Sequence, residues 1–186
     1  MTVLMHDMSV GSFVPVLESL TGILAKGAAH GREKNLDLAD ARLAPDMFTL
    51  RQQVQIACEH ARSCVLRLTG QTVPVFGFTE AGFEELQAGI AATIAFLKGV
   101  DAAAFEGAGA REIVIELPGD LVLAMNGLQL LQAWALPNFY FHVVTAYGIL
   151  RHNGVSIGKR DYLSQLGPMI HPRGAAHLSG AWAQGQ

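Results

Sequence analysis

Apolar side chains recur every three or four residues in four stretches of this 186-residue chain, and that periodicity predicts four amphipathic helices. The first helix should begin at an N-cap formed by Ser9 and end where Gly27 and Gly31 interrupt the pattern. Pro15 lies inside this helix and lacks the amide hydrogen that a helix interior uses. We therefore expect distortion in its first turn.

The ends of the next two helices are marked by capping residues. The second should begin within 46–49, because Thr49 and Gln52 have the spacing of a capping box, and it should stop at Gly70. The third should open at Thr79 with the glutamate that follows it, and end at the glycine after its last apolar residue. Both helices carry a continuous apolar stripe for a core.

A β-hairpin should precede the fourth helix. Residues 112–117 and 121–125 are rich in β-branched and apolar residues and flank the turn 118–120. The fourth helix should run from about 128 to 152, kinked by Pro137. Four helices in a chain of this size predict an all-α four-helix bundle.

The long connections argue against a simple up-down-up-down order of these helices. The pattern predicts one domain over 1–165, followed by a tail over 166–186 that is rich in Gly, Ala and Pro.

The amino-acid composition indicates which kinds of partner the protein can have among another copy of itself, a nucleic acid and a membrane. Hydrophobic residues make up 51% of the chain and charged residues 16%, which suits a large core and predicts a further surface buried in a two-fold homodimer. The net charge is -3 and the 13 Lys and Arg are scattered, so we expect no nucleic-acid partner. The uncharged stretch 121–150 is interrupted by polar residues and begins like a strand, so we expect a buried helix and no membrane span.

The cysteines and the N-terminus favour a cytoplasmic location. Cys58 and Cys64 lie six residues apart on one predicted helix, which separates their α-carbons by about 9 Å, too far for a disulfide. Unpaired buried thiols suit a reducing compartment. The first residues lack the basic and apolar regions of a secretory signal.

Asn138 and His142 are the most informative polar pair. They lie four residues apart on the nearly uncharged fourth helix, so their β-carbons are about 6 Å apart on one face. Helix bundles build ligand and metal sites from such inward-facing side chains.

Two segments of the chain carry a family resemblance. PNFYFHVVTAYGILRHNGV, followed by GKRDYL, and ARLAPDMFTLRQQVQIACEHA resemble an uncharacterised bacterial branch of the DinB/YfiT-like superfamily, a family of unknown function. The similarity covers about Met8 to Leu163. It implies an up-down-down-up four-helix bundle, often homodimeric.

In the wider superfamily, three histidines hold a divalent metal, so the resemblance implies such a site here. Relatives in that superfamily include thiol-dependent transferases and isomerases.

This chain departs from the three-histidine pattern that the resemblance implies. The superfamily has one histidine on the second helix and two on the fourth, and the matching positions here hold Gln55, Asn138 and His142. A shifted register would put Gln53 in place of Gln55. Amide oxygens bind zinc and nickel poorly, so we expect no cofactor, with a divalent metal (Zn or Ni) as the alternative.

His60 and Tyr147 are further candidates. His60 stands beside Glu59 on a flank of the second helix, where it would complete a metal shell or serve acid–base chemistry, although a solvated helix face is the simpler interpretation. Tyr147 should pack in the core with its hydroxyl at the rim of the pocket.

The leading hypothesis is a cytoplasmic module that binds an unknown small molecule at Gln55, Asn138, His142 and Tyr147. A divalent-metal-dependent enzyme of the thiol-dependent transferase or hydrolase type is the alternative, and a structural dimer module without pocket chemistry is the third.

Overall fold

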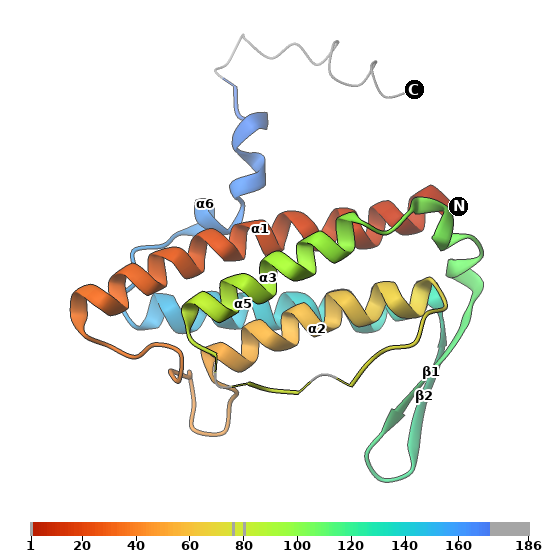
Figure 1. Ribbon diagram of the computed structural model, residues 1–186, viewed down its shortest axis with the longest axis horizontal. Coiled ribbons are helices and arrows are strands. Elements are labelled where there is room, and N and C mark those ends of the chain that lie inside the picture. Colours follow the sequence, from red (N-terminus) through yellow and green to blue (C-terminus); the bar gives the residue numbers. More distant parts are fainter. Residues whose placement is uncertain (1, 76, 80, 172–186) are drawn as a thin grey trace.

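The computed structural model describes residues 2–75, 77–79 and 81–171 as a mostly helical fold with one small antiparallel hairpin (Figure 1). Four long helices lie side by side: α1 (Thr2–Lys34), α2 (Leu50–Leu68), α3 (Phe83–Lys98) and α5 (Leu136–His152). The hairpin of β1 (Glu112–Leu117) and β2 (Leu121–Asn126) projects from one end of them. The short elements are η1 (Ala102–Phe105), η2 (Ala108–Ala110), α4 (Gly127–Gln129), η3 (Leu130–Ala135), α6 (Lys159–Tyr162) and η4 (Ser164–Met169).

The core lies between the four long helices. α2 packs against both α5 and α3, and α1 packs against α3. Phe13 of α1 meets Phe139 of α5 edge to face, with ring centroids 4.9 Å apart, and both rings are fully buried. Each such side chain contributes about 1.5–3 kcal/mol through burial. Buried residues of α2 and α5 belong to the same core, which holds these two helices against each other.

α1 differs from the predicted first helix at both ends. It begins before Ser9, which is not an N-cap: its Oγ donates to the carbonyl of Met5 at 2.7 Å within the helix. Pro15 therefore lies mid-helix rather than in the first turn. The helix continues past Gly27. The glycine instead allows close packing against α5, because a β-carbon at this position would overlap the side chain of Leu150.

The predicted capping box of α2 is confirmed. The backbone N–H of Gln52 donates to Thr49 Oγ1 at 3.4 Å, and the N–H of Thr49 donates to Gln52 Oε1 at 3.0 Å. The helix stops just before Gly70, whose φ of 72° favours glycine. α3 begins later than predicted, with Gly82 as its N-cap, because Thr79 is engaged by the side chain of Gln55.

The hairpin is confirmed, with Glu112 opposite Asn126. The predicted fourth helix is instead divided into α4, the π-helical segment η3 and α5. Pro137 lies in the first turn of α5, where a missing N–H is tolerated. Just before it, the N–H of Leu136 donates to the carbonyl of Leu131, five residues earlier in the chain. The wider π turn thus replaces the expected mid-helix kink.

The glycine that opens α4 determines where this segment sits. Gly127 is buried, and a β-carbon there would overlap the carbonyl oxygen of Ala108 in η2. Only glycine allows so close a backbone approach. The contact brings η3 and its tryptophan beside the C-terminal half of α2.

By length and composition, α1 over Leu4–Lys34 could cross a membrane, and so could the bent pair of α3 and residues 102–110 taken as one span. In the most apolar part of α1, 56% of the residues are buried inside the fold. η4 extends across the predicted start of the tail at residue 166, and just before that point Ser164 Oγ lies 2.7 Å from Ser19 Oγ of α1. Residues 172–186 of that tail lie outside the described residues.

Candidate functional site

His142 on α5 is buried and meets Gln53 on α2. Its Nδ1 lies 2.6 Å from Gln53 Oε1. The Gln53 amide nitrogen donates to the carbonyl of Phe48 at 3.3 Å, and because a carbonyl only accepts, the amide oxygen must be the atom that faces His142. Nδ1 of His142 therefore carries the hydrogen and donates it, which leaves a lone pair on Nε2. Burial lowers the pKa of His142 and favours this neutral form.

A second imidazole stacks on the first. The rings of His60 and His142 are nearly parallel, at 15°, with centroids 5.7 Å apart, and the indole of Trp134 packs edge-on against His60. Burial lowers the pKa of His60 to about 4, and the neighbouring His142 and Arg67 lower it as well. Both rings are therefore neutral at pH 7. His60 is partly buried, not on the solvated face that the sequence favoured.

His60 forms part of the wall of a pocket of about 110 Å³ between α2, η3 and β1. Its polar side chains all come from α2, and Trp134 of η3 closes one side. These polar lining residues are Glu59, His60, Ser63 and Arg67. Glu59, Ser63 and Arg67 follow one another at four-residue spacing, so the sequence did carry a signal for this face.

The thiol of this pocket is held in its protonated form. Cys64 also lines the wall, and burial raises its pKa to about 12. A thiol with so high a pKa is a poor nucleophile at pH 7. The pocket therefore offers hydrogen bonds and charge rather than a thiolate.

The structure does not bring the four predicted site residues together. Gln55 donates from Nε2 to Thr79 Oγ1 at 2.8 Å, on the side of α2 that faces α3. Two residues along a helix differ by about 200° in direction, so Gln53 and Gln55 point to opposite sides, and the shifted register is the one adopted.

The remaining two predicted residues are engaged elsewhere. Asn138 is half-buried and donates from Nδ2 to the carbonyl of Trp134 at 2.7 Å, within its own helical segment. Tyr147 packs edge-on against Tyr162 of α6, with centroids 6.5 Å apart, and does not line the histidine pocket. Only His142 takes part in the cluster described above.

These residues do not fit a three-histidine metal site. Within residues 2–75, 77–79 and 81–171, no three His, Cys, Asp or Glu side chains are grouped so that they could hold a metal ion. The amides of Gln53 and Asn138 are already engaged by other groups. The imidazoles of His60 and His142 stack face to face, so their in-plane lone pairs do not converge on one point as zinc ligands do.

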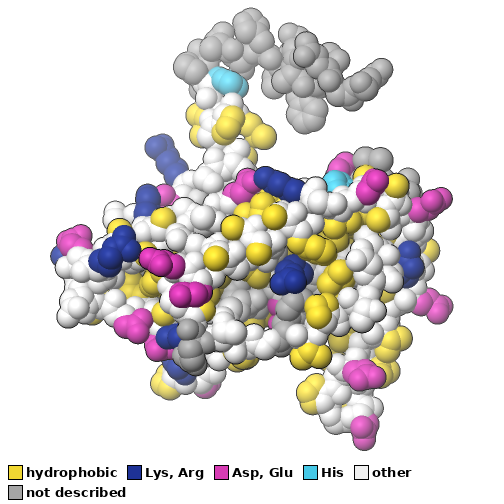
Figure 2. Space-filling model, in the orientation of Figure 1, with side chains coloured by type: hydrophobic (Ala, Val, Ile, Leu, Met, Phe, Trp, Pro, Cys, Tyr) yellow, Lys and Arg dark blue, Asp and Glu magenta, His cyan; other side chains and the backbone are white. Residues whose placement is uncertain are grey.

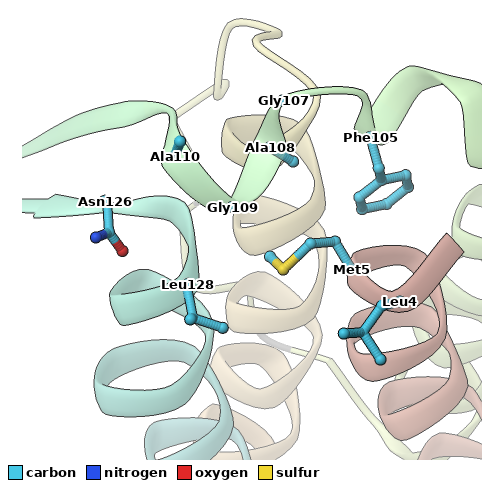
Figure 3. A pocket seen from close by; sticks show the side chains of 9 residues that line it. All are labelled: Leu4, Met5, Phe105, Gly107, Ala108, Gly109, Ala110, Asn126 and Leu128. Atoms are coloured by element: carbon cyan, nitrogen blue, oxygen red, sulfur yellow. The ribbon is translucent and has the colours of Figure 1, made fainter. Parts of the chain in front are cut away.

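A larger apolar pocket of about 400 Å³ lies where α1 begins (Figure 3). Leu4 and Met5 of α1 face Phe105 and Leu128 across it, and Asn126 is its one polar side chain among the described residues. The Asn126 oxygen accepts the backbone N–H that follows it by three residues. Because none of the described residues that line it is titratable, this pocket offers mainly apolar contact, and the site chemistry lies at His60.

Residues 5–163 match the family described as a domain of unknown function, DUF1993. The chain belongs to the DUF1993 family. This DUF1993 chain is similar to a DinB family member protein from Shewanella denitrificans whose crystal structure is known. The two share 41% sequence identity over 87% of this chain and 93% of that one, with a TM-score of 0.78. No curated protein matches. The family resemblance is therefore confirmed, together with a DinB-like helical fold.

Proposed function

We propose that this DUF1993 protein binds a small polar molecule in the pocket lined by His60, without a tightly held zinc or nickel ion. The observation that carries the proposal is the chain of contacts behind the pocket. Phe48 fixes the amide of Gln53, Gln53 fixes the tautomer of His142, and His142 supports the ring of His60. Preorganised polar groups of this kind orient a ligand in a largely apolar cavity.

The ring nitrogens of His60 are available to such a molecule. Among the described residues, none forms a hydrogen bond to them. A neutral imidazole offers one donor and one acceptor, so His60 can bind a ligand group of either kind. Its lowered pKa means that it does so uncharged throughout the physiological range.

Three further properties belong to this proposal. The helices follow the up-down-down-up order of the superfamily, the protein acts in the cytoplasm, and it forms a homodimer. Exposed apolar side chains support the last point: Phe141 and Val144 on α5 are 57% and 50% exposed, and the hairpin also carries apolar side chains on its surface (Figure 2). Light scattering of the purified chain should give twice the mass of one chain, and a monomer mass would contradict the dimer.

A thermal-shift screen tests the binding proposal. Small polar molecules are screened against the wild type, His60→Gln and His152→Gln, the last being an exposed histidine at the end of α5 that serves as the matched control. Molecules that bind at the pocket should raise the Tm of the wild type and of the control, and lose this effect in His60→Gln. A screen in which no stabilising molecule depends on His60 would overturn the proposal.

A further inference from the structure

Arg67 is the feature of the histidine pocket that the imidazole pair does not explain. It lines the pocket, and among the described residues its guanidinium makes no hydrogen bond and no ion pair within 4 Å. By contrast, Arg111 donates to the carbonyl of Leu68, and Arg51 lies 2.8 Å from Asp40. A partly desolvated guanidinium without an acceptor is costly, and carboxylate oxygens are well shaped to satisfy it.

Glu59 is an acceptor in the same position. It lies two helical turns before Arg67 and lines the same pocket, yet the two make no ion pair within 4 Å. Burial raises the pKa of Glu59 more than Arg67 lowers it, and burial lowers the pKa of Arg67 more than Glu59 raises it. Their mutual attraction therefore does not compensate their loss of hydration, and both groups remain open to a partner.

The pocket thus presents separated positive and negative groups, with His60 and the hydroxyl of Ser63 beside them. A simple anion would meet Arg67 but would also lie near the carboxylate of Glu59. A simple cation would be attracted by Glu59 but repelled by the guanidinium of Arg67. A molecule that carries both charges avoids either repulsion.

We propose that the occupant of this pocket is a small α-amino acid, with its carboxylate on Arg67 and its ammonium group on Glu59. The inference rests on the proposed function and names the ligand class of the same site. The pocket volume of about 110 Å³ is below the usual range for drug-sized ligands, which favours a small amino acid over a bulky one.

The experiment compares three matched probes on the full chain by thermal shift and titration calorimetry. Alanine carries both charges, propionate lacks the ammonium group, and ethylamine lacks the carboxylate. Alanine should raise the Tm of the wild type, and the other two should bind at least about tenfold more weakly, the loss of one charge-assisted contact.

Variants assign the two contacts. Arg67→Gln should weaken the binding of alanine by about tenfold or more. The affinity of Arg67→Lys for alanine should lie between those of Arg67→Gln and the wild type, which separates loss of charge from loss of fold. Glu59→Gln should weaken the binding of alanine, whose ammonium group loses its partner. It should strengthen the binding of propionate, because it removes a negative charge near the propionate carboxylate. Arg151→Gln, an exposed arginine on α5, should change nothing.

Equal binding of alanine and propionate by the wild type, or alanine binding that survives Arg67→Gln, would overturn the amino-acid assignment. If alanine fails while other molecules stabilise the protein through His60, the ligand class is wrong and the proposed function stands. If no molecule depends on His60, both proposals are wrong.

Discussion

Acidification below pH 6.5 should destabilise this protein through His60. An unfolded chain binds a proton at this imidazole with a pKa of 6.5, whereas burial lowers the pKa to about 4 in the folded chain. Between these values the unfolded state holds the proton and the folded state does not. The free energy of unfolding therefore has its full value above pH 6.5 and falls as the pH drops toward 4.

The size of this loss follows from the two pKa values. At about 1.36 kcal/mol for each pKa unit, the interval from 6.5 to about 4 corresponds to a limit of about 3.4 kcal/mol, of which about 2 kcal/mol is lost by pH 5. His60 is partly exposed, so solvent screening reduces the loss at pH 5 to the order of 1–2 kcal/mol. Burial lowers the pKa of His142 too, which adds to the loss in the same direction.

Urea unfolding at about pH 7 and about pH 5 measures this loss. The wild type should lose on the order of 1–2 kcal/mol more than His60→Gln, which lacks the titrating ring. His152→Gln, which removes an exposed imidazole, should behave like the wild type. Equal losses in the wild type and His60→Gln would show that burial of His60 is not the cause of the acid destabilisation.

Three further predictions concern the metal-site register, a close backbone approach and a helix cap. Gln53→His with Asn138→His should create a site that zinc or nickel stabilises in thermal unfolding, whereas Gln55→His with Asn138→His should not, because Gln55 faces α3; equal responses would contradict the register. Gly127→Ala should lower the free energy of unfolding by about 1–3 kcal/mol, since its β-carbon meets a backbone carbonyl, and an unchanged urea midpoint would refute this contact. Thr49→Ala should cost about 1 kcal/mol by removing the cap of α2, and denaturation with no change in midpoint would show that the capping box contributes nothing.

Features fixed by neighbouring residues could be predicted from the sequence. The cap of α2 depends on Thr49 and Gln52 alone, and the hairpin depends on two short strands and the turn between them. The family resemblance likewise rests on contiguous segments, and the match to the family confirms it. None of these features depends on which residues of other helices lie nearby.

Features fixed by tertiary packing could not be predicted. Gln53 and Gln55 are chemically identical, and only the rotation of α2 against α5 decides which one meets His142. His60 is a flank residue of an isolated helix and becomes a pocket wall because η3 places Trp134 against it. The start of α1 was misplaced because Ser9, a common N-cap residue, is instead fully buried inside the helix, where its hydroxyl donates to the carbonyl of Met5.

Gln53 holds His142 in one neutral tautomer behind a neutral His60, and the proposed site depends on this arrangement. Long-range ¹⁵N NMR of the imidazole nitrogens across pH 5–7 measures the protonation and tautomer of each ring directly. We expect His142 to carry its hydrogen on Nδ1, this hydrogen to be protected from exchange, and His60 to stay neutral down to about pH 5. A hydrogen on Nε2 of His142, or a His60 ring that is charged at pH 6, would contradict it.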